Sequence, residues 1–276
     1  MRKVNRIVDS AKKTVVFLGG EDDFCATGFF IGIQNCLHLV TAKHVVFDSK
    51  SKQFIDDQLI AYFNLKHGGL GKRSVRNVKD RLGLEWVFHP SDEVDIALIP
   101  FEFTPEEDDV RVIPTKYFLE VNKIAELFDV FFPSYQPGIQ PESVENSNRI
   151  TPVLRVGAVS IINTDRTFYI DGAAFPGNSG SPVFVRPSRV RPDIGRITVG
   201  EDSLDGKFVG VIGSYVPYRE VAISAQTRSP RVVFEENTGL SKVWSAAFIR
   251  EIIESEGFRE QFERVKSEEN VKEKEN

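Results

Sequence analysis

The sequence contains the stretch Phe175-Pro176-Gly177-Asn178-Ser179-Gly180-Ser181-Pro182, followed at once by the apolar run Val183-Phe184-Val185. Glycines closely flank Ser179, and glycine adopts backbone conformations closed to other residues and lets another chain approach the main chain. A nucleophilic serine needs such surroundings, because its hydroxyl must be exposed while nearby N–H groups converge on a developing oxyanion. We assign that oxyanion hole to the N–H groups of Gly177 and Ser179. A tight turn between two strands is the competing interpretation of this stretch taken alone.

A second segment places a histidine after a run typical of a strand, and it reads Leu39-Val40-Thr41-Ala42-Lys43-His44-Val45-Val46. An imidazole can take a proton from a serine hydroxyl near neutral pH and pass it to a leaving group. His44 is therefore the candidate base, although a single histidine in such a place is more often structural. The other histidines have no comparable context, and we expect surface or core positions for His38, His67 and His89.

A third segment, Val94-Asp95-Ile96-Ala97-Leu98-Ile99-Pro100, carries an aspartate in apolar surroundings. A buried carboxylate is costly unless it is paired or hydrogen-bonded. Beside an imidazole, Asp95 would fix the tautomer and stabilise the imidazolium. An aspartate at a strand edge facing solvent is the alternative, and Asp92 and Glu93 in the preceding turn compete for the role. We prefer Asp95 because the pattern places it within the strand.

From Thr14 onward, short apolar runs alternate with turn residues, a pattern typical of an all-β sandwich or barrel. The first series of expected strands comprises 14–18, 28–33, 37–41, 59–65, 84–88 and 94–100. The second comprises 129–133, 153–162, 167–170, 182–185, 208–215 and 231–234, with long surface loops expected over 138–148 and 186–205. His44 and Asp95 fall in the first series and Ser179 in the second, so a cleft between two β units would bring the three together.

The chain thus divides into two β units flanked by helical segments. Apolar residues spaced as on one helix face occur near the N-terminus and again from residue 243, and the C-terminus is almost wholly charged or polar. We predict a helical arm over 1–12, a first β unit over 13–112, a linker over 113–128, a second β unit over 129–242, a C-terminal helix over 243–266 and a charged disordered tail over 267–276.

Composition restricts the partners that the sequence predicts. The 276 residues include 35 basic and 40 acidic ones, a net charge of −5, with no long basic run. Neither nucleic acid nor an anionic membrane is indicated as a partner. No apolar stretch of membrane-spanning length occurs, and the charged N-terminus does not read as a signal peptide, so we expect a cytoplasmic protein. Cys25 and Cys36 are expected as free thiols, a single disulfide being the alternative, and no zinc-ligand spacing occurs.

Three segments taken together resemble the signature segments of trypsin-like serine peptidases: Thr41-Ala42-Lys43-His44, Asp95-Ile96-Ala97-Leu98 and Gly177-Asn178-Ser179-Gly180-Ser181-Pro182. The closer likeness is to the bacterial, cysteine-poor branch that includes the HtrA-type proteases. Thr27-Gly28-Phe29-Phe30-Ile31 resembles the strand before the histidine, and Tyr135-Gln136-Pro137-Gly138 a turn of the second barrel. The likeness covers roughly residues 13–250. It implies two six-stranded antiparallel barrels, a triad of His44, Asp95 and Ser179, peptide-bond hydrolysis through an acyl-enzyme, and no cofactor.

The resemblance also suggests where substrate binds. Ala173 corresponds to the base of the pocket for the side chain before the cut bond, which favours a small or medium apolar residue there. Asp171 is close enough to matter if the loop is shifted. Gly213-Ser214-Tyr215 resembles the pocket wall, which would also bind the substrate backbone as an added strand. No peptide-binding second domain of the HtrA kind follows Ser241, so we do not expect HtrA-style trimers or peptide-triggered activation.

Other functions compete with proteolysis by a broadly acting enzyme. An α/β-hydrolase needs Gly-x-Ser-x-Gly before a helix, whereas here Ser181, Pro182 and a strand follow Ser179. A catalytically silent or partner-activated module of the same fold, acting as a binding or regulatory protein, is the main alternative. A protease dedicated to one partner protein would share the chemistry and differ in its substrate range. The expected partners are a protein or peptide substrate and an activating protein, with the oligomeric state open.

Overall fold

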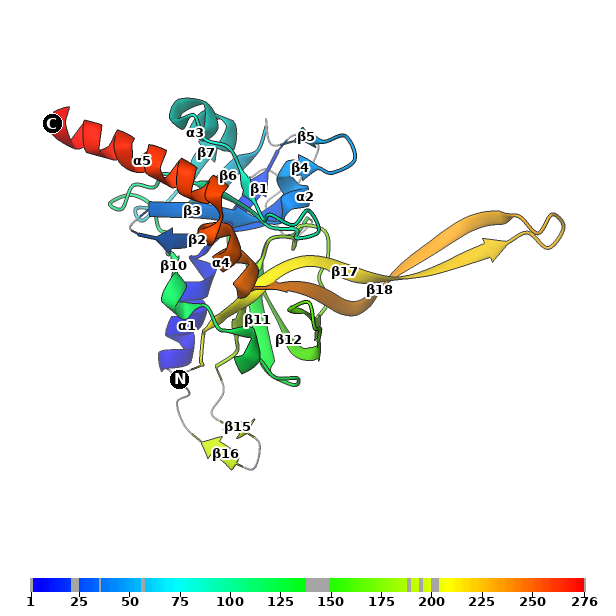
Figure 1. Cartoon of the computed structure of the whole chain (residues 1–276). Helices are drawn as coiled ribbons and strands as arrows, with labels where there is room; N and C mark the ends of the chain where they lie inside the picture. Colours follow the sequence, from blue (N-terminus) through cyan, green and yellow to red (C-terminus); the bar gives the residue numbers. More distant parts are fainter. Residues whose placement is uncertain are drawn as a thin grey trace.

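The computed structural model describes residues 2–20, 25–34, 36–55, 58–137, 149–187, 190–193, 196–199 and 204–275. It contains two β units of unequal shape, with helices at both ends of the chain (Figure 1). The all-β fold class expected from the sequence is confirmed. No helix within the described ranges is both long enough and apolar enough to cross a membrane.

The first β unit follows helix α1 (Arg2–Lys12) and is an antiparallel sheet apart from one parallel pair. Its strands are β1 (Val15–Gly19), β2 (Cys25–Ile33), β3 (Cys36–Thr41), β6 (Ile60–Asn64), β7 (Leu70–Ser74), β8 (Val87–Phe88), β9 (Ala97–Pro100) and β10 (Ile113–Pro114). They pair in the order β7-β6-β1-β2-β3-β9-β8, with β10 parallel to β2. The remaining elements are α2 (Lys43–Val46), the small pair β4 (Phe47–Asp48) and β5 (Gln53–Phe54), and α3 (Val75–Leu82).

This pairing order does not close, so the first unit is an eight-stranded sheet and differs from the six-stranded barrel that the resemblance implied. The reason lies at its two ends. Strand β7 runs directly into α3, whose first turn is capped by the Ser74 side chain accepting the Asn77 N–H. Strand β8 spans only two residues and pairs with β9 alone. The two-residue strand β8 offers β7 almost no edge with which to close the ring.

The second β unit is a closed barrel of six strands, as expected. The strands are β11 (Asp129–Ser134), β12 (Val153–Ile162), β13 (Thr167–Asp171), β14 (Pro182–Val185), β17 (Phe208–Ile223) and β18 (Pro230–Ser245), in the order β11-β12-β13-β18-β17-β14. Strand β10 and the 3₁₀ turns η1 (Thr115–Tyr117) and η2 (Val121–Lys123) occupy the expected linker. The expected loop 138–148 lies outside the described residues.

Two parts of the second unit differ from the sequence prediction. Strands β17 and β18 have 16 residues each and extend far beyond the barrel as one long hairpin (Figure 1), whereas the apolar pattern predicted short strands at 208–215 and 231–234. The segment 186–205, expected as a loop, contains the paired strands β15 (Val190–Asp193) and β16 (Arg196–Val199). In both regions, backbone hydrogen bonds between paired strands hold the β structure although the sequence has no continuous apolar pattern there. The apolar pattern alone therefore did not predict these strands.

The C-terminal helix also differs from the prediction. Val243 and Trp244 pair with β13 and β17 as part of the barrel, so the helix begins only at Ala246. Helix α4 (Ala246–Glu254) breaks at Ser255, and α5 (Glu256–Glu275) follows. The expected disordered tail is therefore helical through Glu275. Glu and Lys dominate this segment and have high helix propensity, which accounts for the continuation.

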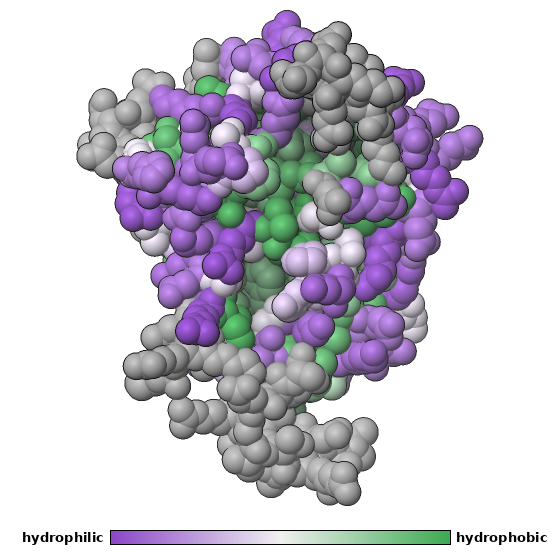
Figure 2. Space-filling view, turned by 90° about the vertical axis from the view of Figure 1, so that its left-hand side faces the viewer, coloured by the Kyte–Doolittle hydropathy of each residue, from purple (hydrophilic) through white to green (hydrophobic). Residues whose placement is uncertain are grey.

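Alternate side chains of the central strands enter different apolar clusters, as the pleat of a strand requires. Phe30 packs in the interior of the first unit, while its neighbour Phe29 joins a cluster that continues into the barrel and α4. A third cluster fills the barrel. The shared cluster holds the two units against each other. Figure 2 shows the left-hand side of Figure 1, where a central band of apolar surface is framed by hydrophilic residues.

Candidate active site

His44 lies at the end of the first unit that faces the barrel loops. Strand β3 ends at Thr41, and the short helix α2 begins two residues later with Ala42 as its N-cap. Val45 and Val46 are buried and hold this turn in the core, while 50% of the His44 side chain stays exposed. The burial of its neighbours directs the imidazole to the surface.

Asp95 contacts His44 through both carboxylate oxygens. The backbone N–H of His44 donates to Oδ1 at 2.9 Å, and Nδ1 donates to Oδ2 at 2.7 Å. This second bond leaves Nε2 as the nitrogen able to accept a proton. Asp95 lies two residues before β9 rather than inside a strand. Its expected position within a strand, for which it was preferred over Asp92 and Glu93, was therefore wrong. The competitor Asp92 bonds the Lys43 ammonium at 3.1 Å.

The pKa of His44 reflects two opposing effects. Burial of the imidazole lowers it, while the hydrogen bond that the ring donates to Asp95 and the negative charge of that carboxylate raise it. The two contributions of Asp95 together prevail, so the pKa lies above the ordinary value for histidine. The pair is thus arranged to stabilise an imidazolium at this position.

Ser179 lies on a turn whose shape depends on glycine. The Asn178 N–H donates to the Phe175 carbonyl at 2.9 Å, and Gly177 has a φ of 89°. A positive φ at the third position of such a turn is typical of type II. Asn178 is fully buried, accepts the Phe175 N–H and donates to the Tyr135 carbonyl. The N–H groups of Gly177 and Ser179 donate to no described residue, which leaves both available to an oxyanion.

Strand β2 fixes this turn from the first unit. The Thr27 hydroxyl donates to the Gly177 carbonyl at 2.8 Å, and its N–H donates to the Ser179 carbonyl at 3.1 Å. A Cβ at Gly180 would lie 2.2 Å from the Thr27 carbonyl oxygen and 2.4 Å from the Thr41 hydroxyl. Gly180 is therefore required by close approach as well as by its φ of 83°. Sequence reasoning missed the role of Thr27, whose one signal was a polar residue in an apolar strand.

Gly213 brings the serine and the aspartate to one place. The Ser179 hydroxyl donates to the Gly213 carbonyl at 3.3 Å, and Asp95 Oδ2 lies 3.7 Å from the position of a Cβ on Gly213. Ser179, His44 and Asp95 therefore gather around the start of the free part of β17. Ser179 and His44 form no hydrogen bond with each other in this structure.

The expected substrate residues lie on two neighbouring segments. Ser241 of β18 pairs with Tyr215, and its hydroxyl accepts the Ala174 N–H and donates to the Gly172 carbonyl. This contact places the loop that contains Ala173 beside the strand 213–215. Gly213 is buried, Ser214 exposed and Tyr215 half-buried, and Asp171 ends β13 at an exposed position.

Arg155 of β12 is a further residue of this region that sequence reasoning missed. Its Nη1 donates to the Ala173 carbonyl at 3.2 Å, and its guanidinium stacks over the Phe175 ring at 4.7 Å. The Gln136 side chain also accepts from it. The Arg155 guanidinium is thus held against the loop that contains Ala173.

A family model described as a trypsin-like peptidase domain matches residues 26–190. The chain belongs to that family. The matched range contains His44, Asp95 and Ser179.

Solved structures with this peptidase fold include HtrA-type proteases. The HtrA-type protease AlgW with tripeptide has a TM-score of 0.53 at 14% identity, and the match covers 91% of this chain and 62% of that one. The serine endoprotease from Yersinia pestis gives 0.52 at 15% identity, with 93% and 66% covered. The peptidase thus spans less than two thirds of the length of either. No curated protein sequence matched it.

One cysteine of this peptidase lies next to the serine turn. Cys25 and Cys36 form no disulfide, as expected. Cys25 lies beside the turn, with Sγ 3.0 Å from the position of a Cβ on Gly177, and burial raises the pKa of its thiol to about 12, which keeps it neutral. Across the described ranges, no three His, Cys, Asp or Glu side chains gather in an arrangement that would hold a metal ion.

Proposed function

We propose that this trypsin-like peptidase hydrolyses peptide bonds through an acyl-enzyme formed on Ser179. The Ser179 oxygen attacks the carbonyl carbon of the substrate while His44 Nε2 takes the hydroxyl proton. The carbonyl oxygen becomes an oxyanion that accepts hydrogen bonds from the N–H groups of Gly177 and Ser179. His44 then gives the proton to the departing amine, and water releases the acyl group by the same steps in reverse.

The double hydrogen bond between His44 and Asp95 is the observation that carries this proposal. Bonds of 2.9 and 2.7 Å fix both the backbone and the ring of the histidine, and so assign Nε2 as the proton acceptor. A merely structural histidine at the surface does not need a carboxylate that holds one tautomer. A half-exposed imidazole with a raised pKa suits a group that must gain and lose a proton.

Ser179 must change its rotamer for this chemistry, because its hydroxyl donates to the Gly213 carbonyl rather than to His44. Rotation of a serine side chain takes picoseconds to nanoseconds. The same observation favours the second candidate, a module that becomes active only when a partner or substrate turns Ser179 toward His44. For specificity, we propose a small or medium apolar residue before the cut bond. Ala173 carries no charge, and the Arg155 guanidinium that bonds its carbonyl would repel a Lys or Arg side chain of the substrate.

Active-site labelling tests the proposal directly. A fluorophosphonate probe should label the wild-type protein at Ser179, and Ser179→Ala should abolish labelling without changing the far-UV circular dichroism. Ser91→Ala is the matched control, because Ser91 is an exposed serine whose only described contacts use its backbone. Labelling that appears only after a protein extract is added would favour the partner-activated module. Labelling that persists in Ser179→Ala would refute the assignment.

A further inference from the structure

The backbone pairing along one edge of β17 ends at Ser179. Strand β14 pairs with β17 over its first residues, and the pairing continues through the Gly180 N–H to the Ile212 carbonyl and the Ile212 N–H to the Ser181 carbonyl, both at 2.9 Å. The next contact along this edge is the Ser179 hydroxyl on the Gly213 carbonyl. Beyond Gly213, this edge of β17 pairs with no described strand.

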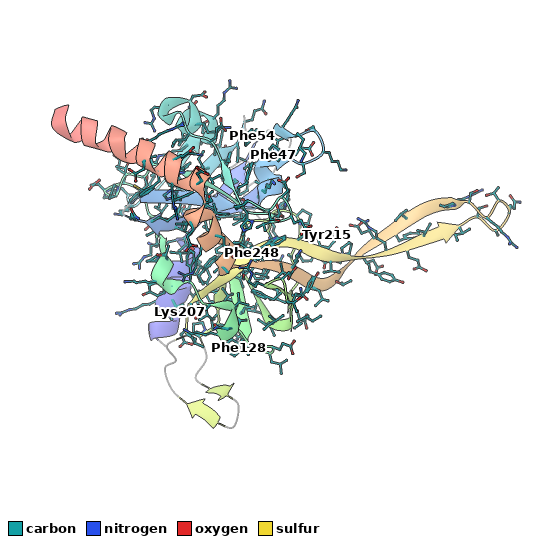
Figure 3. All side chains as sticks on the ribbon, viewed as in Figure 1. Phe47, Phe54, Phe128, Lys207, Tyr215 and Phe248 are labelled. Atoms are coloured by element: carbon teal, nitrogen blue, oxygen red, sulfur yellow. The ribbon has the colours of Figure 1, made fainter. Side chains whose placement is uncertain are left out.

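The free edge continues outward along the hairpin. We name residues 216–238 the arm; its strands pair only with each other and extend away from the barrel (Figure 1). Tyr215, labelled in Figure 3, lies where the arm leaves the body. Large apolar side chains on both faces of the arm are 45–64% exposed: Tyr218, Val221, Ile223, Val232, Val233 and Phe234. Two strands alone are marginally stable in water, so these side chains are suited to contact another chain.

The orientation of the backbone groups on this edge follows from one hydrogen bond and one proline. The Val216 carbonyl accepts from the Thr238 hydroxyl of β18 at 2.7 Å and therefore faces the partner strand. The pairing of β17 with β18 is irregular at Val216 but regular from Pro217 to Ala222, where backbone groups alternate. Since Pro217 has no N–H to donate to β18, we infer that the backbone groups of residues 217, 219 and 221 face the free edge. Pro217 has no N–H and is a residue that strands tolerate at an edge. Arg219 and Val221 are thus the next donors along it.

We infer that the arm extends this binding edge beyond residues 213–215, so that the more distant upstream part of a protein substrate adds to residues 217–223 as an antiparallel strand. The inference rests on the proposed function. Strand β17 runs from the barrel to the tip, so an antiparallel chain whose cut bond lies at Ser179 has its N-terminal side along the arm. The edge from Gly213 to Ile223 spans about ten residues of such a chain at the spacing of a strand.

The side chains of the arm indicate which segments bind. A strand added beside β17 places alternate side chains on the two faces of the sheet, next to Tyr218 on one face and to Val221 and Ile223 on the other. β-branched and aromatic residues pack best in such cross-strand positions. The substrate class is therefore a protein with an extended, apolar, β-forming segment before the cleavage site, which a compact folded protein would not present.

Substrate length provides the first test. Two peptides would share the best cleavage site from a library, with four or with twelve residues upstream, the extra ones alternating Val and Thr. We expect kcat/KM at least tenfold higher for the long peptide. A peptide of equal length with proline at alternate upstream positions cannot pair as a strand and should fall to the value of the short one. Equal kcat/KM for all three peptides would overturn the inference.

Two protein variants locate the effect on the arm. Val221→Pro removes a donor on the free edge while the bonds between β17 and β18 remain, and Val221→Thr keeps the donor as its control. The second variant replaces residues 219–235 by Asn-Gly, which closes the hairpin at the Tyr218–Glu236 pair. In both the Val221→Pro variant and the variant with the shortened arm, kcat/KM for the long peptide should fall to the value for the short peptide. The short peptide, which does not reach Val221, should be cleaved at the wild-type rate.

The outcomes separate this inference from the proposed function. If no peptide is cleaved and the fluorophosphonate probe does not label Ser179, the proposed function is wrong. If both variants keep the full advantage of the long peptide, the arm does not bind substrate and the inference is wrong. Sedimentation of the shortened-arm protein provides a further check. The protein could change from oligomer to monomer while the ratio of kcat/KM for the long peptide to kcat/KM for the short peptide stays the same. That result would assign the arm to contact between copies of the protein and would also overturn the inference.

Discussion

A single carboxylate, Asp95, sets both the orientation and the basicity of His44. The protonated imidazole cannot accept the Ser179 proton, so activity should fall as the pH drops through the raised pKa of His44. In Asp95→Asn, the raising effect of the carboxylate is lost while burial still lowers the pKa, so this acid limb should move to lower pH. We also expect kcat to fall by about 10⁴, the loss measured for the corresponding change in a serine protease triad.

The pH profile of kcat/KM tests this prediction. Asp92→Asn is the control, because Asp92 bonds Lys43 and makes no described contact with His44; its profile should match that of the wild-type enzyme. An acid limb at the same pH in Asp95→Asn would show that another group controls the titration of His44.

Gly180 and Gly68 both have a positive φ but lie in very different surroundings. Their φ angles are 83° and 91°, but a Cβ at Gly180 would meet the Thr27 carbonyl oxygen at 2.2 Å, while at Gly68 it would meet nothing within 4 Å. Gly68→Ala should lower the free energy of unfolding by about 1 kcal/mol, the usual penalty for an alanine with a left-handed backbone. Gly180→Ala should lower the free energy of unfolding by at least about 2 kcal/mol more than Gly68→Ala does, because β2 must move away from the turn. Urea unfolding measures both, and equal losses would contradict the close approach.

The residues of the site differ in how far the sequence could predict them. The sequence could single out His44, Asp95 and Ser179 because each lies in a short contiguous pattern, and the structure places the three near one another. Thr27 and Arg155 could not be singled out, because their contacts with the serine turn depend on how two sheets meet, and sequence periodicity does not determine that.

At the scale of whole elements, the apolar pattern predicted most strands of both units and failed where it was ambiguous or absent. Val243 and Trp244 match helical spacing, yet they are buried as part of a barrel strand. The arm contains charged residues and Pro217 between its apolar ones, so only residues 231–234 had the composition of a strand. The first unit stayed open because closure depends on strand lengths at its ends, which the resemblance could not supply.

Helix α5 packs on a buried histidine, which makes its attachment sensitive to acid. His38 is fully buried, its ring lies 5.2 Å from Phe258 and 6.2 Å from Phe262, and its Nε2 has no described hydrogen-bond partner. Burial lowers the pKa of His38 to about 4, although the Cys36 carbonyl partly raises it. The unfolded chain therefore binds the proton more tightly, and stability should fall as the pH drops below about 6.5 until it passes about 4.

The contribution of His38 can be isolated by comparing two pH values. Between pH 7.5 and 5.0, the free energy of unfolding of the wild-type protein should fall by about 2 kcal/mol more than that of His38→Leu. His67→Gln, at an exposed position, should behave as the wild-type protein does. An equal pH dependence in His38→Leu would exclude this histidine as the acid-sensitive group.

At the scale of the molecule, the proposed catalysis would need both units, because His44 and Asp95 belong to one and Ser179 to the other. Phe208, at the start of β17, connects them. It is fully buried, with its ring 5.4 Å from Phe29 of β2 and 4.9 Å from Phe118. Phe168 is buried equally well but lies in the cluster inside the barrel. Replacing either residue by alanine should lower the free energy of unfolding by about 3–5 kcal/mol.

The two alanine variants should lose activity in different ways. In Phe208→Ala, the units should separate before either one unfolds, so fluorophosphonate labelling of Ser179 should be lost at a lower urea concentration than the far-UV circular dichroism. In Phe168→Ala, the barrel itself is weakened, and labelling and dichroism should disappear together. Because both residues are phenylalanines with no exposed surface, the comparison removes side-chain size as a cause. Coincident transitions in both variants would mean that docking and folding of the two units are one event.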